Sequence, residues 1–509
     1  MATASLDDLG RSGDWENYHR TGRSRLKARW ALRSGDAGRG RDDVAQAAAK
    51  VLAWLREGRS ASVPVRPVGG AWSPSNIQTV QDGWMLNTRR FNRCFRLAPA
   101  DFNPSRPVDA AAFMLVEGGV QIDEINDKLE EMGRSLTTTG ASNGQTLPGA
   151  CATGTHGSVL GAGGIQQHVR AMQIVTPGGI HWIEPAEGVM SDEFIRGTGS
   201  SPLRDDEVFQ AALVAVGSLG IVTAMVIETE PLYLVRPFLK VIDFSRQDLE
   251  DLQRGAFQAF SDRHGPKGRD PLFVMVVTNP YRPFRKATVR LLYKFPWRED
   301  YQRHERAELG AGYDAQTMLA WAFRNLPWAP GWMIQLLMRI AVGRGITEEV
   351  YGTWGETTET HRPLADMFTG ALFCDRARLV ETFEKMCTAF TGAGGATAVT
   401  LRFLDGADPR RFGLLSPARW QHTASLDCDG PASERTRDAF LRMLSALEAA
   451  GIEHSCHWGK YNNLTPERVR GVYGADLARW KAVRERLLPT LADRQLFATG
   501  ELRAFGLAE

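Results

Sequence analysis

Cysteine is scarce in this chain: six residues are scattered through 509 positions, and no two are spaced as a Cys-x-x-Cys pair. Neither a disulfide framework nor a zinc site is therefore indicated. The cluster His454-Ser455-Cys456-His457 lacks two further ligands at suitable spacing, so no metal is expected there. An excess of one charge sign is also missing, because the net charge is only +2. This balance gives no electrostatic signature of nucleic-acid binding.

Long uninterrupted apolar runs are missing as well. The first residues (MATASLDDLGRSGDWENYHRTGRS) contain no apolar region of a signal peptide, so a cytoplasmic location is expected. The apolar segment Gln316–Gly343 contains arginines and is broken by Pro327 and Pro330, which argues against a transmembrane helix. We expect it to form a helical wall of a substrate domain; contact with a membrane or an apolar substrate is the alternative. No strand pattern is followed by Gly-x-Gly-x-x-Gly, which disfavours a Rossmann nucleotide site.

What is present is the hydrophobic content of a large globular protein, 43% of the residues. A chain of this length exceeds the size at which a single core keeps growing, so at least two domains are expected. Residues 1–41 are polar and are expected to wrap the surface or to be partly disordered. Apolar periodicity then predicts helices at 42–56 and 122–132 and strands at 63–68, 112–116, 171–175 and 221–228.

The pattern changes after Leu232. Long alternating runs at 272–277 and 287–295 predict strands of a separate sheet. Strands, helices and glycine-rich loops together predict an α+β protein.

Three loops of small residues interrupt the first half of the chain. They are Val68–Ser75 (VGGAWSPS), Thr146–Ser158 (TLPGACATGTHGS) and Gly217–Thr223 (GSLGIVT). Glycine and alanine leave peptide N–H groups bare enough to hold a pyrophosphate or the edge of a flat ring. Such loops indicate a cofactor that is both flat and phosphorylated.

This arrangement resembles the PCMH-type FAD-binding domain of the vanillyl-alcohol oxidase family, and within it the aldonolactone oxidase and alditol oxidase branch. The segment His457-Trp458-Gly459-Lys460 and the tail Arg484–Pro489 are similar to the HWxK segment and "REKLDP" tail of aldonolactone oxidases. The resemblance implies two domains, with a cap built on a mostly antiparallel sheet flanked by helices. The implied parts are an N-terminal extension at 1–41, an FAD-binding domain at 42–232, a substrate (cap) domain at 233–449, and a segment at 450–509 that returns to the FAD-binding domain.

The resemblance implies FAD as the cofactor. In aldonolactone oxidases a histidine of the first loop bonds covalently to the flavin, whereas this chain has Trp72, whose indole lacks a nucleophilic nitrogen. FAD is therefore expected to bind non-covalently. We expect His156 to hold its loop through both ring nitrogens rather than to be catalytic. The candidate cofactor contacts are Val68, Gly69, Gly70, Ala71, Trp72, Ser73, Gly149, Ala152, Thr153, Gly154, Thr155, His156, Gly157, Ser158, Gly220, Ile221, Val222 and Lys460.

The same resemblance nominates catalytic residues. Lys460 matches a lysine beside the active site, where a positive group stabilises charge on the N1–C2 edge of the flavin. The branch carries a Glu-x-Arg pair which, aligned on Ser416-Pro417, falls on Thr400 and Arg402, so the arginine is kept and the glutamate is replaced. His457 is the fourth candidate catalytic residue, beside Lys460, Thr400 and Arg402. The missing carboxylate argues against simple transfer of sugar-lactone or polyol specificity, and His361-Arg362 and Asp427 are polar residues that could substitute.

The expected function is oxidation of an alcohol by hydride transfer to flavin N5, with oxygen or another acceptor reoxidising FAD. The Trp-rich middle of the chain and Thr400 favour a bulky, less polar small molecule as substrate. Two alternatives stay open. One is a biosynthetic tailoring flavoenzyme that performs an oxidative cyclisation or a redox-neutral epimerisation, and the other is a flavin-binding module whose catalysis has lapsed with Thr400.

Overall fold

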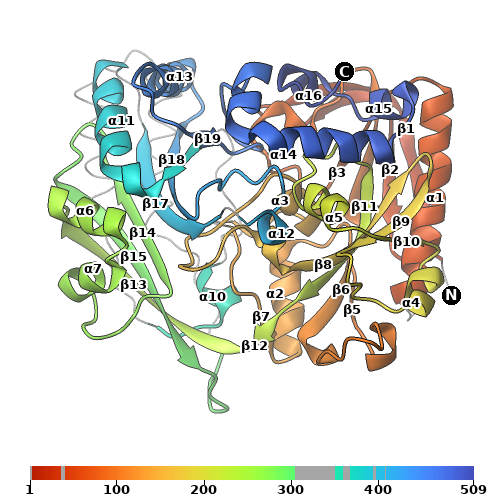
Figure 1. Ribbon diagram of the computed structural model, residues 1–509, viewed down its shortest axis with the longest axis horizontal. Coiled ribbons are helices and arrows are strands. Elements are labelled where there is room, and N and C mark those ends of the chain that lie inside the picture. Colours follow the sequence, from red (N-terminus) through yellow and green to blue (C-terminus); the bar gives the residue numbers. More distant parts are fainter. Residues whose placement is uncertain are drawn as a thin grey trace.

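The computed structural model describes residues 3–35, 40–140, 142–303, 350–358, 367–393, 397–406 and 408–509. Its sheets and helices are arranged as an α+β fold, as predicted (Figure 1). The expected helical wall Gln316–Gly343 and the pair His361-Arg362 lie outside the described residues. Within them, no helix is long and apolar enough to cross a membrane.

The N-terminal residues form a β-hairpin, so the expectation of a surface wrap or partial disorder was wrong. Strands β1 (Ser5–Glu16) and β2 (Arg23–Arg33) pair antiparallel, and β2 continues in parallel onto β4 (Gly83–Arg90), which pairs with β3 (Val65–Val68). In the first half of β2, buried and exposed side chains alternate. A strand with one buried face can thus have a polar composition overall.

A six-stranded sheet forms the centre of the first half of the chain. Helix α1 (Gly40–Ser60) packs against its strands, and the buried side chains of both belong to one hydrophobic core. The predicted helix at 42–56 and the four predicted strands are confirmed, with shifts of a few residues at their ends. The sheet order is β10 (Ser201–Arg204), β9 (Gly179–Glu184), β8 (Val169–Thr176), β11 (Ile221–Glu228), β6 (Phe113–Glu117) and β5 (Cys94–Arg96).

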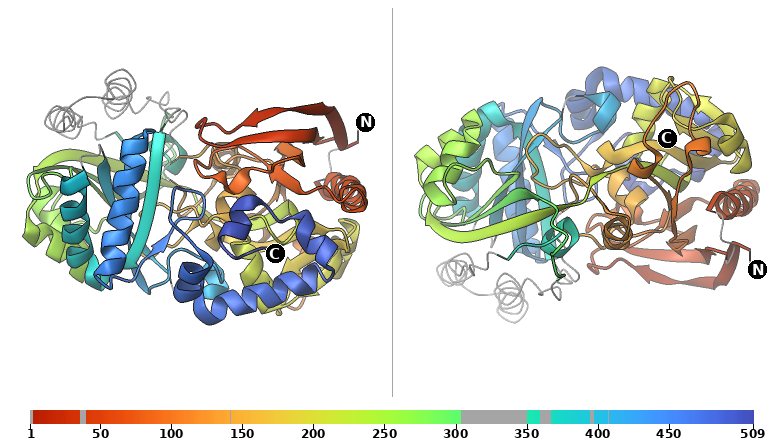
Figure 2. Two further views of the ribbon diagram at one scale, coloured as in Figure 1. Left: turned by 90° about the horizontal axis from the view of Figure 1, so that it is seen from above. Right: turned by 90° about the horizontal axis from the view of Figure 1, so that it is seen from below.

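A second large sheet begins at Tyr233, where the sequence pattern changes. All its neighbouring strands pair antiparallel. Helices α6 (Arg246–Arg254), α11 (Leu379–Ala393) and α13 (Glu434–Ala449) pack on one face of it (Figure 2). The strand order is β13 (Tyr233–Asp243), β15 (Lys286–Pro296), β14 (Phe273–Thr278), β17 (Ala398–Asp405), β18 (His422–Pro431), β16 (Met367–Asp375) and β19 (Ser455–Cys456).

The last sixty residues return to the first half of the chain. Helix α14 (Pro466–Leu487) packs on α5 (Asp206–Leu213), and α15 (Leu491–Leu496) and α16 (Gly500–Ala504) follow beside the N-terminal sheet (Figure 1, Figure 2). The buried guanidinium of Arg484 donates to Ser218 Oγ at 2.9 Å, in the third small-residue loop. The C-terminal helices therefore support the loops that border the site.

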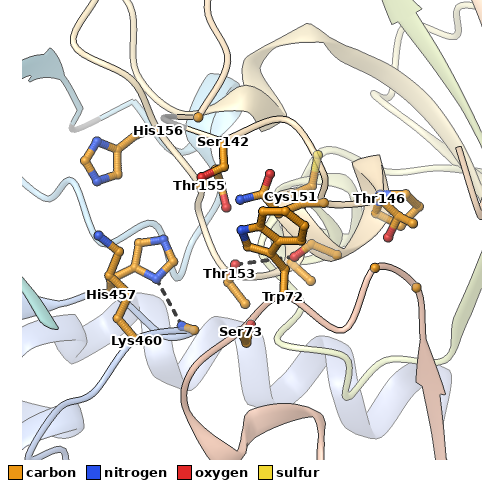
Figure 3. A pocket seen from close by; sticks show the side chains of 18 of the residues that line it. Trp72, Ser73, Ser142, Thr146, Cys151, Thr153, Thr155, His156, His457 and Lys460 are labelled. Carbon is orange, nitrogen blue, oxygen red and sulfur yellow. Dashed lines mark hydrogen bonds between the residues drawn. The ribbon is translucent and has the colours of Figure 1, made fainter. Parts of the chain in front are cut away.

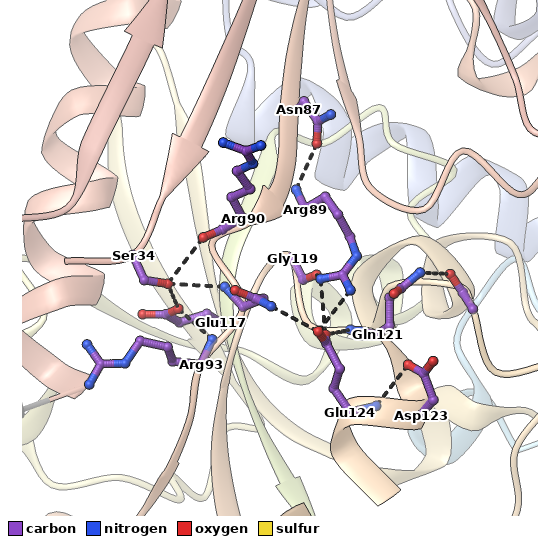
Figure 4. A network of polar contacts seen from close by, with 12 residues as sticks. Ser34, Asn87, Arg89, Arg90, Arg93, Glu117, Gly119, Gln121, Asp123 and Glu124 are labelled. Atoms are coloured by element: carbon purple, nitrogen blue, oxygen red, sulfur yellow. Dashed lines mark hydrogen bonds and ion pairs between the residues drawn. The ribbon is translucent and has the colours of Figure 1, made fainter. Parts of the chain in front are cut away.

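A polar network at the end of β6 holds the neighbouring strands close together (Figure 4). The buried carboxylate of Glu117 accepts hydrogen bonds from Ser34 Oγ at 2.5 Å and from the backbone N–H of Arg93 at 2.7 Å. Two residues later, a Cβ at Gly119 would lie 1.8 Å from the carbonyl oxygen of Thr88. Only glycine permits this approach of β4 to β6.

Glu117 predicts a pH dependence of stability. Burial raises its pKa to about 7, above that of the unfolded chain, so the folded state retains a proton that unfolding releases. Its contribution to stability is therefore present at low pH and is lost as pH rises through 7. Between pH 5 and 8, the stability of the wild type relative to Glu117→Gln should fall by on the order of 2 to 3 kcal/mol. Denaturation curves across this range measure it, and a constant difference would contradict the raised pKa.

Candidate functional site

One large cavity, with a volume of about 590 Å³, lies between the small-residue loops and the inner face of the seven-stranded sheet. All three loops line it on one side, and strands β14, β15, β16, β17 and β18 line it on the other. Figure 3 shows side chains of the first two loops together with His457 and Lys460 around this space. The sequence-predicted cofactor loops and the sequence-predicted catalytic residues thus meet in one place.

The first loop borders the cavity with all six predicted residues, Val68 to Ser73. Its backbone lies directly against the second loop, because a Cβ at Gly69 would lie 2.2 Å from Thr146 Oγ1 and one at Gly70 2.4 Å from the oxygen of Gly144. The indole of Trp72 stacks on the ring of Tyr18, at a centroid distance of 4.7 Å. The N-terminal hairpin therefore forms part of the wall beside the first loop.

The second loop contains the short helix α3 (Leu147–Ala152), and many of its residues line the cavity. Two predicted contacts, Gly154 and Ser158, do not line the cavity. Gly154 faces Pro417, and Ser158 Oγ donates to the carbonyl of Val274 and accepts from the N–H of Phe403 at 2.8 Å. These two residues join the loop to the substrate-side sheet instead of facing a cofactor. The predicted residues that line the cavity are Gly149, Ala152, Thr153, Thr155, His156 and Gly157.

In the third loop, Gly220 and Val222 line the cavity, but Ile221 does not. Ile221 is fully buried at the start of β11. Successive side chains of a strand point to opposite faces, so Ile221 and Val222 cannot both face the same cavity.

Arg66, at the centre of β3, is a cavity residue that the sequence analysis missed. Its guanidinium donates to the carbonyl oxygens of Gly217 at 2.7 Å and Val216 at 3.0 Å, and also to that of Ile77. No carboxylate among the described residues lies within ion-pair distance of it, and burial lowers its pKa to about 10. The feature of the sequence that could have identified Arg66 is a charged residue inside a short apolar strand, three positions before the Gly69-Gly70 pair.

The loop side of the cavity fits a dinucleotide such as FAD. A buried cation is costly unless an anion accompanies it, and guanidinium groups bind phosphate oxygens well. Arg66 therefore gives the cradle a cation suited to a pyrophosphate. Gly69, Gly70 and Gly220 border the cavity, and the absence of side chains there lets the surrounding segments pack closely around it.

On the sheet side, Thr400 and Arg402 of β17 and Lys460 all border the cavity. The register pairs Thr400 with Asp427 of the neighbouring strand β18. Arg402 Nη2 and Lys460 Nζ each lie 3.2 Å from the same Oδ2 of Asp427, while Ser425 Oγ donates to its Oδ1 at 2.6 Å. Asp427 thus provides a carboxylate one strand away from Thr400, the position where the resemblance to alditol oxidases implies a glutamate.

The pKa values of two aspartates of β18 are shifted in opposite directions. Burial by itself raises the pKa of Asp427, but Arg402 and Lys460 outweigh this and hold the pKa well below its usual value. Asp429, two residues along the same strand, lines the cavity, and burial together with the charge of Asp427 raises its pKa. Carboxyl groups whose pKa values are pushed apart are suited to different roles in acid–base chemistry. The sequence analysis did not identify Asp429.

Two histidines that line the cavity, His156 and His457, are neighbours, with ring centroids 6.0 Å apart. Burial lowers the pKa of His156 to about 4 and that of His457 well below its usual value, so both are neutral at neutral pH. His457 Nδ1 accepts from the N–H of Gly459 at 3.0 Å, which leaves its proton on Nε2. Among the described residues, His156 has a hydrogen bond through Nδ1 alone, to the oxygen of Gly157 at 3.0 Å, and not through both ring nitrogens as expected.

Parts of this chain are similar in sequence to known proteins. Residues 44–183 match the family described as FAD binding domain. D-arabinono-1,4-lactone oxidase from Candida albicans is 26% identical over 195 residues, which cover 37% of this chain and 32% of that protein. The chain therefore matches about a third of the length of such relatives.

Two solved structures cover nearly the whole chain. Cholesterol oxidase from B. sterolicum superimposes with a TM-score of 0.71 at 13% identity, covering 99% of this chain and 97% of that one. The VAO-type flavoprotein MtVAO615 from Myceliophthora thermophila superimposes with a TM-score of 0.58 at 14% identity, covering 91% of this chain and 78% of that one. Residues 44–183 are therefore similar to the FAD binding domain of aldonolactone oxidases, and the whole chain has the same α+β fold as these two solved structures.

Proposed function

We propose that this protein is an FAD-dependent oxidoreductase that oxidises the CH–OH group of a small-molecule alcohol, with FAD bound non-covalently. One observation carries the proposal: a single cavity joins a glycine-lined cradle with the buried cation Arg66 to the Arg402–Asp427–Lys460 cluster. The similarity to aldonolactone oxidases in the FAD binding domain supports it. Oxygen or another acceptor completes the cycle.

FAD bound in the cradle would supply the acceptor for the hydride of the alcohol carbon. Three residues and the seven-stranded sheet contribute to that step. Arg402, fixed by Asp427, donates to the substrate oxygen through its planar guanidinium. Asp429, which lines the cavity and whose pKa burial raises above its usual value, accepts the hydroxyl proton. Lys460 contributes positive charge where negative charge develops, and the sheet excludes water, which strengthens that interaction.

Trp72 predicts the mode of flavin attachment. Because its indole offers no nucleophilic nitrogen at the position of the family's linking histidine, acid precipitation of the purified protein should release the yellow cofactor into the supernatant. The supernatant spectrum measures this. Colour that stays with the pellet and fluoresces on a denaturing gel would show that a covalent bond is present.

Lys460 and Arg402 are expected to affect different kinetic constants. Lys460→Met removes a preorganised positive charge and should slow anaerobic reduction of the flavin by an alcohol by roughly 10² to 10³-fold. Arg402→Lys keeps the charge but loses the planar fork, so it should chiefly weaken substrate binding. Stopped-flow reduction at varied substrate concentration separates the two effects. Parent values for both variants would place the active site elsewhere.

Asp427 is expected to act by positioning both cations. Asp427→Asn removes the charge that Arg402 and Lys460 share, so it should impair the rate of flavin reduction and substrate affinity together. Ser425→Ala, which removes only the hydroxyl bond to Oδ1, is the matched control and should have a much smaller effect. Equal effects of the two substitutions would contradict a shared anchor.

A further inference from the structure

The polar face of the cavity extends beyond Arg402 to a second guanidinium. Met275 of β14 is paired with Arg402 of β17 on one side and with Arg290 of β15 on the other. All three side chains line the cavity. The two arginines are thus two strands apart on one face of the sheet, roughly 10 Å between their backbones.

Arg290 differs from Arg402 because it has no acidic partner. No carboxylate among the described residues lies within ion-pair distance of it, and its Nη2 donates to the carbonyl oxygen of Thr357, at the end of α10 (Trp354–Thr358). Asp429, which lines the cavity, and the buried Asp427 belong to β18, three strands away or roughly 14 Å at the backbone. Burial, and then the charge of Arg402, lowers the pKa of Arg290 to about 10, which leaves it cationic at neutral pH.

The surroundings of Arg290 are apolar. Its guanidinium carbon lies 6.0 Å from the ring centroid of Phe273, and Trp354, Met275 and Leu239 also line this part of the cavity. Removing a cation from water and surrounding it with apolar side chains costs free energy, and binding of an anion offsets this cost. A guanidinium with free N–H groups binds a carboxylate with two parallel hydrogen bonds.

We propose that Arg290 is the binding site for a carboxylate on the substrate. The substrate class is an alcohol with an apolar or aromatic body, whose carboxylate lies several bonds from the reacting C–OH group. The inference rests on the proposed function for the position of the C–OH group, which Arg402 contacts. The spacing of the two arginines sets the distance between the two ends of the substrate, and Phe273 and Trp354 flank its body.

A pair of probes of equal shape tests the proposal: 4-(hydroxymethyl)benzoate and 4-(hydroxymethyl)benzamide. Each is titrated into the flavin-loaded protein under nitrogen, and both the equilibrium perturbation of the flavin spectrum and its bleaching are recorded. The wild type should bind the carboxylate at least tenfold more tightly than the amide. Arg290→Met should weaken binding of the carboxylate by about 10²-fold, as expected for loss of a charged, paired hydrogen-bond donor, and binding of the amide by less than threefold.

Lys286→Met is the matched control. It removes a positive charge from the same strand β15, but at an exposed position where Lys286 pairs with Asp243. It should leave the preference for the carboxylate unchanged. Arg290→Lys keeps the charge without the planar fork and should lose about tenfold in affinity for the carboxylate. This variant decides the question if the methionine variant does not fold.

The outcomes separate this inference from the proposed function. Equal binding of the two probes by the wild type, or an unchanged preference in the Arg290 variants, overturns the carboxylate site even where alcohols bleach the flavin. Binding of the carboxylate that depends on Arg290, without bleaching by any alcohol, supports the site and contradicts the proposed oxidation.

Discussion

The cavity depends on one buried carboxylate, that of Asp427. It joins β17, through Arg402, to the segment after β19, through Lys460, so residues far apart in the sequence act as a unit. A buried ion pair is costly to break, because the remaining partner is left without compensation in a medium of low polarity. The arrangement therefore fixes both cations in one orientation. It also holds the pKa of Asp427 well below its usual value, whereas burial raises the pKa of the neighbouring Asp429.

The opposite wall of the cavity is held by close backbone contact rather than by charge. Gly70 packs against the backbone of Gly144, and Gly119 against that of Thr88, at distances that no larger residue permits. Bare peptide groups border the cavity as a consequence. Arg66 adds the only strong charge on this wall among the described cavity residues, tied to the third loop through Gly217. One wall is thus suited to a phosphorylated ligand and the other to a polar reacting group.

Much of the fold could be predicted, because strands and helices with one buried face carry a periodic pattern. The helix at 122–132 and the strands at 272–277 and 287–295 were predicted close to their observed bounds. The N-terminal hairpin was missed because the polar composition of residues 1–41 was the basis of the prediction, although charged residues alternate with apolar or small ones in the first half of β2. Within the site, Ile221, Gly154 and Ser158 do not line the cavity for a related reason: neighbours in a loop or strand face different ways, and a motif does not show which of them faces the cavity.

The sequence by itself determined which chemical groups are available: small-residue loops for a flat cofactor, an indole at Trp72, and a hydroxyl instead of a carboxylate at Thr400. Only the tertiary structure decided which groups meet. Asp427 lies beside Thr400 because antiparallel pairing of β17 and β18 places the two opposite each other, although 27 positions separate them. Arg290 and Arg402 share a face for the same reason, on either side of Met275. Strand register is set by the packing of a whole sheet, so such cross-strand neighbours leave no local signal in the sequence.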